Sequence, residues 1–215
     1  MFAFVSPLTA LTRRPLQPPL RQSLTRTTFV GRALLAAAVI ATPLTIVRGE
    51  SSQAPTPSTT MTLSDLATLK DIDGNPVSPD AFAGKVVFAM NVASACGYTQ
   101  SGYALFKKLT DKYSPNDFVA VAIPCNSFGF QESGSSEQIK SFALARADKL
   151  LIMERSDVNG AKQHPIVQLA KSKFPGKISW NFDGRYVFDR KGHPIARFGN
   201  SASDAEIEAT IDSAL

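Results

Sequence analysis

The stretch Val86-Val-Phe-Ala-Met-Asn-Val92 runs directly into Ala93-Ser-Ala-Cys96-Gly97, and this junction decides the fold. Seven largely apolar residues in a row have the length of a strand but not the alternation of a half-exposed one, which is typical of a buried central strand. A helical pattern follows, because Leu105, Leu109 and Tyr113 fall on one face. The junction is therefore predicted to be the first half of a parallel βαβ unit.

Further strands and helices alternate toward the C-terminus. Residues 118–123 are predicted to form a second buried strand, and residues 150–153 a short one. Helices are expected where the sequence carries two capping boxes and a proline suited to a first helical turn, at Ser135–Gln138, Ser203–Glu206 and Pro165. Residues 186–198 have the pattern of a β-hairpin around the turn Asp189–Gly192.

Two finer expectations concern the ends of this series. Residues 66–69 are predicted to form a short strand ahead of a turn at residues 71–75. The last helix is expected to direct Ile207, Ile211 and Leu215 inward. Early βαβ units give parallel pairing and the late hairpin adds an antiparallel edge, so we predict an α/β fold with a mixed sheet between helices, a thioredoxin-like arrangement.

The positive charge of the chain belongs to its N-terminus. The 215 residues carry a formal net charge of +5, but residues 1–49 hold six arginines and no acidic residue. From residue 50 onward, 17 basic residues face 18 acidic ones. An Arg-rich, Ser/Thr-rich and acid-free leader is typical of an organellar transit peptide, and a disordered basic arm is the alternative. We expect import into the mitochondrion first and a plastid second, and the balanced remainder gives no support for a nucleic-acid partner.

An apolar run and a polar linker follow the arginines. Residues 33–47 are mostly apolar but shorter than the roughly 20 residues of a spanning helix. This run fits a second sorting signal, a membrane anchor or the apolar face of the transit helix, so membrane association stays open. Residues 50–60 are rich in Pro, Ser and Thr, which indicates a linker. The folded domain is accordingly expected to span residues 61–215.

Cys96 is the first candidate for chemistry. It stands just after the predicted central strand and just before a helix, which is where sites form in open α/β sheets. Backbone N–H groups and the helix dipole favour an anion there, and the thiolate is the nucleophilic form of cysteine. Thr99 occupies the position three residues further on, so dithiol exchange through Cys-x-x-Cys is disfavoured.

The other cysteine and the two histidines are assigned structural roles. Cys125 ends the second apolar strand and is interpreted as a buried thiol, with a redox role as the alternative. His164 precedes Pro165 and is interpreted as a helix cap or surface residue, and His193 is given the same interpretation. Two cysteines and two histidines exclude a four-cysteine zinc site and leave little for any His-based one, so we expect no metal and no cofactor.

Four ordered segments resemble the signatures of the glutathione peroxidase family and together span most of residues 61–200. They are Asn91-Val-Ala-Ser-Ala-Cys-Gly-Tyr-Thr99, Pro124-Cys-Asn-Ser-Phe-Gly-Phe-Gln-Glu132, Asp157-Val-Asn-Gly160 and Ser179-Trp-Asn-Phe182. The resemblance implies a thioredoxin-like fold and an antioxidant peroxidase that reduces hydrogen peroxide and organic or lipid hydroperoxides with thiols.

The resemblance also implies a catalytic tetrad of Cys96, Gln131, Trp180 and Asn181. Two side-chain amides and an indole N–H can donate to a thiolate and to the departing oxygen without adding a charge. In the implied cycle the Cys96 thiolate attacks the O–O bond and becomes a sulfenic acid, which two thiol exchanges restore.

Departures from the family pattern bear on the reductant. Residues 141–147 lack the resolving cysteine of thioredoxin-dependent members, which favours glutathione or a general thiol. The short stretch from His164 to Trp180 resembles monomeric members that accept lipid hydroperoxides, and Ser133 replaces a usual proline. Three alternatives stay open: a thioredoxin-dependent peroxidase with Cys125 as resolving thiol, a peroxide sensor or relay, and a non-catalytic binding module.

Overall fold

The computed structural model describes residues 60–215. The predicted leader, its apolar run and all of the linker except Thr60 lie outside these residues. The elements follow in the order η1 (Leu63–Asp65), η2 (Pro79–Ala81), β1 (Val86–Val92), α1 (Thr99–Lys112), β2 (Phe118–Pro124), α2 (Ser136–Leu144), β3 (Leu150–Ile152), α3 (Pro165–Lys173), β4 (Arg185–Phe188), β5 (Pro194–Phe198) and α4 (Asp204–Ala214). Within the described part, no helix combines the length and apolar character needed to cross a membrane.

A single mixed sheet carries the domain, with strand order β3-β2-β1-β4-β5. β1 pairs in parallel with β2, which pairs in parallel with β3. On its other side β1 pairs antiparallel with β4, and β4 with β5. The predicted mixed sheet is confirmed, and β1 lies at its centre with all seven residues buried.

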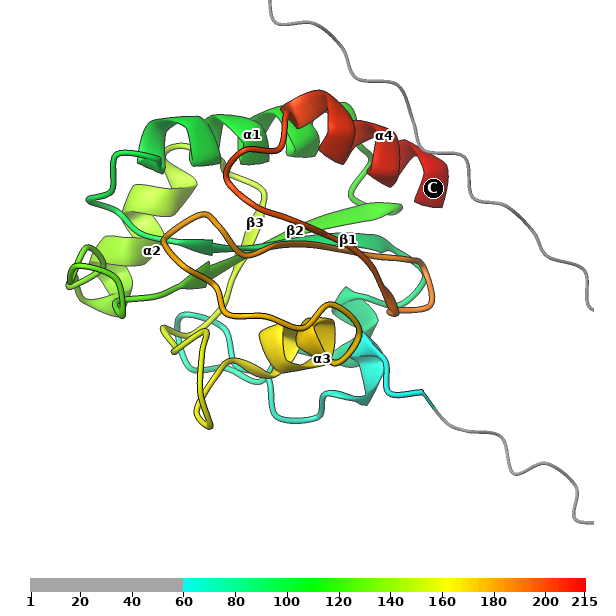
Figure 1. Ribbon diagram of the computed structural model, residues 1–215, viewed down its shortest axis with the longest axis horizontal. Coiled ribbons are helices and arrows are strands. Elements are labelled where there is room, and N and C mark those ends of the chain that lie inside the picture. The colour runs from blue at the N-terminus through cyan, green and yellow to red at the C-terminus, as the bar shows by residue number, and fades with distance from the viewer. Residues whose placement is uncertain (1–59) are drawn as a thin grey trace, which may run out of the picture. The chain divides into compact units, whose positions relative to one another are not determined.

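Helices cover both faces of the sheet, with α1 and α4 on one side and α3 on the other (Figure 1). Alternate residues of β1 supply the two cores. Phe88 and Met90 pack in the cluster that includes residues of α1, α2 and α4, whereas Val87 and Ala89 pack in the cluster that includes α3. A strand buried on both faces favours apolar residues, which explains why every residue of β1 except Asn91 is apolar.

Both capping boxes form as predicted. The Ser135 hydroxyl accepts from the Gln138 N–H at 3.2 Å, while the Gln138 side chain accepts from the Ser135 N–H at 2.8 Å. Ser203 and Glu206 make the same exchange at the start of α4. These reciprocal bonds satisfy N–H groups that a helix leaves unpaired, so they fix where α2 and α4 begin.

Two predictions about individual segments are wrong or incomplete. Residues 66–69 form no strand, because Leu66 and Leu69 pack onto the α3 side of the core. The only pairing nearby consists of isolated bridges, from Lys70 to Pro76 and from Asp71 to Met153. The turn after them forms as expected, with the Asp71 carboxylate accepting from backbone N–H groups. Ile207 and Ile211 are buried, but Leu215 follows the end of α4 and is exposed.

His164 caps α3 as predicted but is not a surface residue. Its Nδ1 accepts from the Ile166 N–H at 3.3 Å, and only 2% of the residue is exposed. Burial disfavours the imidazolium and lowers the pKa of His164 from 6.5 to about 4. The neutral ring is therefore the form that the folded domain accepts.

This burial predicts a pH-dependent stability that a single variant removes. The pKa is lower in the folded state, so the contribution of His164 is fully present above pH 6.5 and is lost as the pH falls toward 4. The loss amounts to about 2 kcal/mol between about pH 7.5 and about pH 5. Urea unfolding at both pH values should show a smaller decrease for His164→Asn, which keeps a capping acceptor but does not titrate. Equal decreases in the two proteins would contradict the assignment.

Candidate active site

Cys96 lies in the loop that joins β1 to α1, as its sequence position predicted. The loop is held by Thr99, whose hydroxyl accepts from the Cys96 N–H at 3.0 Å and donates to the Ala93 carbonyl at 2.8 Å. Cys96 is half-buried and packs against the core on the α1 side of the sheet. Its thiol is free, and the position at the start of a long helix suits a thiolate nucleophile.

Gln131 lies on a second loop, residues 125–132, that is hydrogen-bonded to the Cys96 loop. The Ala95 N–H donates to the Gln131 carbonyl at 3.0 Å, and the Ser94 N–H donates to the Glu132 carboxylate. These two hydrogen bonds, made by consecutive residues of each loop, hold the loops together. They fix the register of Gln131 against the residues that immediately precede the cysteine.

Trp180 and Asn181 lie on a third loop, between α3 and β4, that Asn91 attaches to the central strand. The Asn91 amide donates to the Trp180 carbonyl at 3.1 Å and accepts from the Gly184 N–H at 2.8 Å. The backbone of Asn91 also accepts from the Phe182 N–H at 3.0 Å. Asn91 is completely buried, so its side chain satisfies backbone groups that water cannot reach.

A side-chain bond joins the second and third loops. The Asn181 amide donates to the Gln131 side-chain oxygen at 2.9 Å and to the Phe128 carbonyl at 3.3 Å. This bond uses the oxygen of the Gln131 amide, so the two N–H donors of the same amide are left for a reacting group. Trp180 is 40% exposed, and its ring packs on Phe128 with centroids 5.9 Å apart.

The structure thus brings the loops of all four predicted site residues together. Cys96, Gln131 and Asn181 are linked through the hydrogen bonds of Ala95 and the two amides, and Trp180 is the neighbour of Asn181 in the chain. The Gln131 amide and the Trp180 indole provide donors without a competing formal charge, and Asn181 holds the Gln131 side chain. Such a set can stabilise negative charge as it develops on sulfur or oxygen.

Glu132 is a site residue whose role sequence reasoning missed. It is fully buried, and one carboxylate oxygen accepts from Ser94 while the other has no partner among the described residues. Its own backbone is held by the Asn126 side chain at 2.8 Å and by Arg155 at 2.9 Å. Burial raises the pKa of Glu132, which the bonds from Ser94 and the charge of Arg155 oppose. Glu132 is the last residue of the motif segment Pro124–Glu132, and this position next to Gln131 is the sequence signal for its role.

Cys125 lies at the end of β2 and is fully buried, as interpreted from the sequence. It continues the set of β2 residues, Val121 and Ile123, that pack with α3. Cys96 packs with the opposite cluster, on the α1 side. The two thiols are free and belong to different faces of the sheet.

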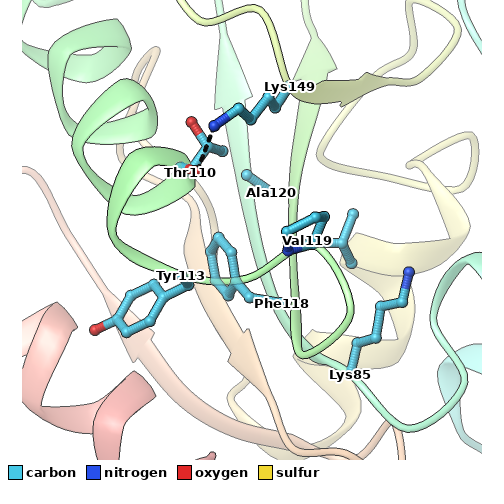
Figure 2. A pocket seen from close by; sticks show the side chains of 8 residues that line it. Lys85, Thr110, Tyr113, Phe118, Val119, Ala120 and Lys149 are labelled. Carbon is cyan, nitrogen blue, oxygen red and sulfur yellow. Dashed lines mark hydrogen bonds between the residues drawn. The ribbon is translucent and has the colours of Figure 1, made fainter.

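The domain also has a hollow that lies far from Cys96 and contains none of the four proposed site residues. It has a volume of about 150 Å³ and lies where β2 begins, at the end of the sheet opposite the cysteine; its lining includes Lys85, Thr110, Tyr113, Phe118 and Lys149. Figure 2 shows the Lys149 amine reaching the Thr110 carbonyl, a bond of 3.3 Å. The Tyr113 hydroxyl points toward α4, where it donates to Asp212 at 2.7 Å. Lys149 and Tyr113 thus use their polar groups to join elements of the fold. Residues 60–215 also contain no group of three His, Cys, Asp or Glu side chains placed to hold a metal ion.

A mixed sheet with one cysteine at the β1–α1 junction defines a thioredoxin-like protein without a Cys-x-x-Cys pair. The fold agrees with solved structures. A thioredoxin-like superfamily protein, SPOA0173, aligns with a TM-score of 0.51 at 14% identity, covering 69% of this chain and 94% of that chain, which shows the fold alone. T. cruzi GPX1 aligns with a TM-score of 0.59 at 32% identity, covering 72% of this chain and 96% of that chain.

The chain belongs to the glutathione peroxidase family. A family model described as glutathione peroxidase matches residues 65–171. Hydroperoxy fatty acid reductase Gpx2 of Synechocystis sp. is 38% identical over 150 residues, which cover 68% of this chain and 96% of that protein.

Two relatives from Arabidopsis thaliana carry organelle names. Phospholipid hydroperoxide glutathione peroxidase 1, chloroplastic, is 41% identical over 153 residues, 69% of this chain and 64% of the relative. A probable phospholipid hydroperoxide glutathione peroxidase 6, mitochondrial, is 38% identical over 149 residues, 67% of this chain and 64% of the relative. The match therefore spans slightly less than two thirds of the length of each of these relatives.

The attachment of the third loop through Asn91 predicts a large effect of one substitution. Asn91→Ala leaves the buried Gly184 N–H without a partner, at a cost of about 1–3 kcal/mol, and removes the shorter of two bonds to the Trp180 carbonyl, which keeps only the Asp183 N–H at 3.4 Å. Urea unfolding should show the domain destabilised by about 2–5 kcal/mol. Trp180 is the only tryptophan of the chain, so its fluorescence should report a loosened loop directly.

Asn116→Ala is the matched control for this substitution. Asn116 is exposed in the turn before β2, and within the described residues its hydrogen bond to Ser114 uses the backbone N–H and not the side chain. Its replacement should change neither the stability by more than about 0.5 kcal/mol nor the tryptophan emission. An Asn91→Ala protein as stable as this control would show that the amide does not hold the loop.

Proposed function

We propose that this protein is a thiol-dependent peroxidase that reduces hydrogen peroxide and organic or lipid hydroperoxides through Cys96, as part of antioxidant defence. The observation that carries the proposal is the hydrogen-bonded connection of the Cys96 loop to Gln131 and of Gln131 to Asn181. It sets uncharged donors beside a thiol at a strand–helix junction. The peroxidase names of its relatives support the same activity.

The proposed cycle uses the thiol twice. The Cys96 thiolate attacks one peroxide oxygen, the O–O bond breaks, and the leaving oxygen takes a proton to become an alcohol or water. Gln131 and Trp180 donate to the sulfur and to the departing oxygen, and Asn181, whose two N–H groups are engaged with Gln131 and Phe128, holds the Gln131 side chain in place. A reductant thiol then displaces water from the sulfenic acid, and a second thiol attacks the mixed disulfide to release Cys96 and the oxidised reductant.

The burial of Cys125 supports an external reductant. A resolving thiol must approach the sulfenic acid until the two α-carbons are within about 7 Å. Cys125 is enclosed on the α3 side of the sheet, while Cys96 packs on the α1 side. We therefore favour glutathione or another external thiol, with a thioredoxin-type protein as the alternative reductant, and we expect a monomer that needs no metal or cofactor.

The leader directs where this chemistry takes place. We propose import into an organelle, with the mitochondrion ahead of the plastid, because residues 1–49 are Arg-rich and acid-free. The chloroplastic and mitochondrial names of the Arabidopsis relatives support an organellar location. Determining the N-terminus of the protein purified from its own cells tests the cleavage, and it also shows whether residues 33–47 remain as an anchor.

The activity is tested by a pair of cysteine substitutions. Cys96→Ser removes the nucleophile and should lower peroxide turnover with glutathione by at least about a thousandfold. Cys125→Ser is the matched control and should keep most of the turnover, because the thiol only fills core volume. Steady-state assays with hydrogen peroxide, using glutathione and thioredoxin in parallel, measure both effects.

The outcomes separate the alternatives. Full turnover by Cys96→Ser would refute the peroxidase assignment. A Cys96–Cys125 disulfide in the mass spectrum of peroxide-treated protein would refute external resolution. Stoichiometric oxidation of Cys96 with poor turnover by either reductant, together with mixed disulfides to other proteins, would instead identify a peroxide sensor or relay.

A further inference from the structure

The exposed aromatic side chains of the described domain gather around the proposed site. They are Tyr98, Phe130 and Trp180, exposed to 45%, 81% and 40%. Tyr98 follows Cys96 by two residues, Phe130 immediately precedes Gln131, and Trp180 immediately precedes Asn181. The other exposed large apolar residues of this part of the chain, Met61 and Leu215, stand near its two ends. Exposed aromatic surface is thus concentrated on the three site loops.

Hydrogen bonds hold these three loops side by side. The Cys96 loop is bonded to the second loop through Ala95 and Gln131, and the second loop to the third through Gln131 and Asn181. Each aromatic residue therefore stands within two residues of a proposed site residue on one of three loops that are bonded to one another. An apolar surface next to a reactive group marks a place for an apolar part of the substrate.

Phe130 is the member of this set that the fold does not explain. It adopts a left-handed backbone, with φ of 54°, immediately after Gly129 at 65°. A bulky residue in that conformation is strained, and glycine would adopt it without cost. The side chain recovers nothing by packing, because most of its surface is in water. Its neighbour Phe128 is half-buried and packs on Trp180, so the loop already has an aromatic anchor.

The surroundings of Phe130 can receive a ligand. It borders a hollow of about 400 Å³ whose other lining residues are Asn126, Ser127, Arg155, Ser156 and Asp157. Arg155 is bonded through one nitrogen to the carbonyls of Glu132 and Gly134, which ties this hollow to the loop that bears Gln131. Phe130 is the one apolar residue in the lining of this hollow, so it is the surface there that an apolar group can contact.

We propose that Phe130 is a specificity-determining residue that binds the apolar tail of organic hydroperoxides. This inference rests on the proposed peroxidase activity and names the residue that favours organic hydroperoxides over hydrogen peroxide. Strain and exposure at Phe130 are tolerated because the ring is covered when an acyl chain binds. Hydrogen peroxide has no tail, so it reacts without using this contact.

The test compares substrates rather than absolute rates. Phe130→Gly suits the left-handed backbone, so the fold should be retained or slightly stabilised in urea unfolding. The ratio of kcat/KM for linoleic acid hydroperoxide to kcat/KM for hydrogen peroxide should fall about tenfold, since a partly buried aromatic contact is lost. Phe130→Leu keeps an apolar contact and should restore much of the ratio. Met61→Ala removes an equally ordinary exposed apolar side chain away from the site and should leave the ratio unchanged.

Two sources of the acyl chain are distinguished in separate arms. One arm uses the fatty acid hydroperoxide as a dispersed monomer, and the other uses phosphatidylcholine hydroperoxide in neutral vesicles. A decrease in both arms assigns Phe130 to the chain itself, and a decrease only with vesicles assigns it to a chain presented by a bilayer. No decrease in either arm overturns the inference.

Failure of the inference is separable from failure of the proposed function. If the unsubstituted protein consumes no hydroperoxide at all, the peroxidase assignment fails. If hydrogen peroxide is consumed normally and Phe130→Gly keeps the substrate ratio, only the role of Phe130 fails. A raised KM for thioredoxin with an unchanged substrate ratio would show that the ring contacts a protein reductant instead, which also overturns the inference.

Discussion

The buried amide of Asn91 is the interaction on which the arrangement of the site depends. It stands in the central strand, where every other side chain is apolar, and it exchanges both of its hydrogen-bonding functions with the loop that carries Trp180 and Asn181. A polar group at that depth is tolerated only when it is fully paired. The same strand that forms the centre of both cores therefore also positions a loop from more than 80 residues further along the chain.

Phe182 secures the opposite side of that loop. Its buried ring lies against Gly102 of α1, where a Cβ atom would come within 2.3 Å of the ring. The ring also packs on Tyr103, with the two ring centroids 6.2 Å apart. Asn91 thus attaches the loop to the sheet, and Phe182 attaches it to the helix that follows Cys96. Because α1 and β1 flank the cysteine, the donors of the third loop are fixed relative to the thiol by rigid elements on both sides.

The sequence predicts those features that depend on local pattern. The apolar run at 86–92, the two capping boxes and the hairpin all form because their patterns agree with the fold that surrounds them. The place of Cys96 between a strand and a helix marks it as reactive, whereas Gln131, Trp180 and Asn181 are indicated only by the family motifs. The hydrogen bonds that join their loops are visible only in three dimensions. The prediction of a strand at residues 66–69 is wrong because apolar residues near a sheet can fill the core without joining a strand. The roles of Glu132 and Asn91 were missed because pairing of a buried polar group with a distant backbone leaves no local pattern.

The isolation of Cys125 has a kinetic meaning. In an enzyme with an internal resolving thiol, the oxidised cysteine is captured in a first-order step whose rate does not depend on the surroundings. In this domain the two thiols pack on different faces of the sheet, so under the proposed cycle each sulfenic acid would wait for a bimolecular encounter. The fraction of the protein that stands oxidised at any moment is then set by the balance between peroxide and thiol concentrations in its compartment.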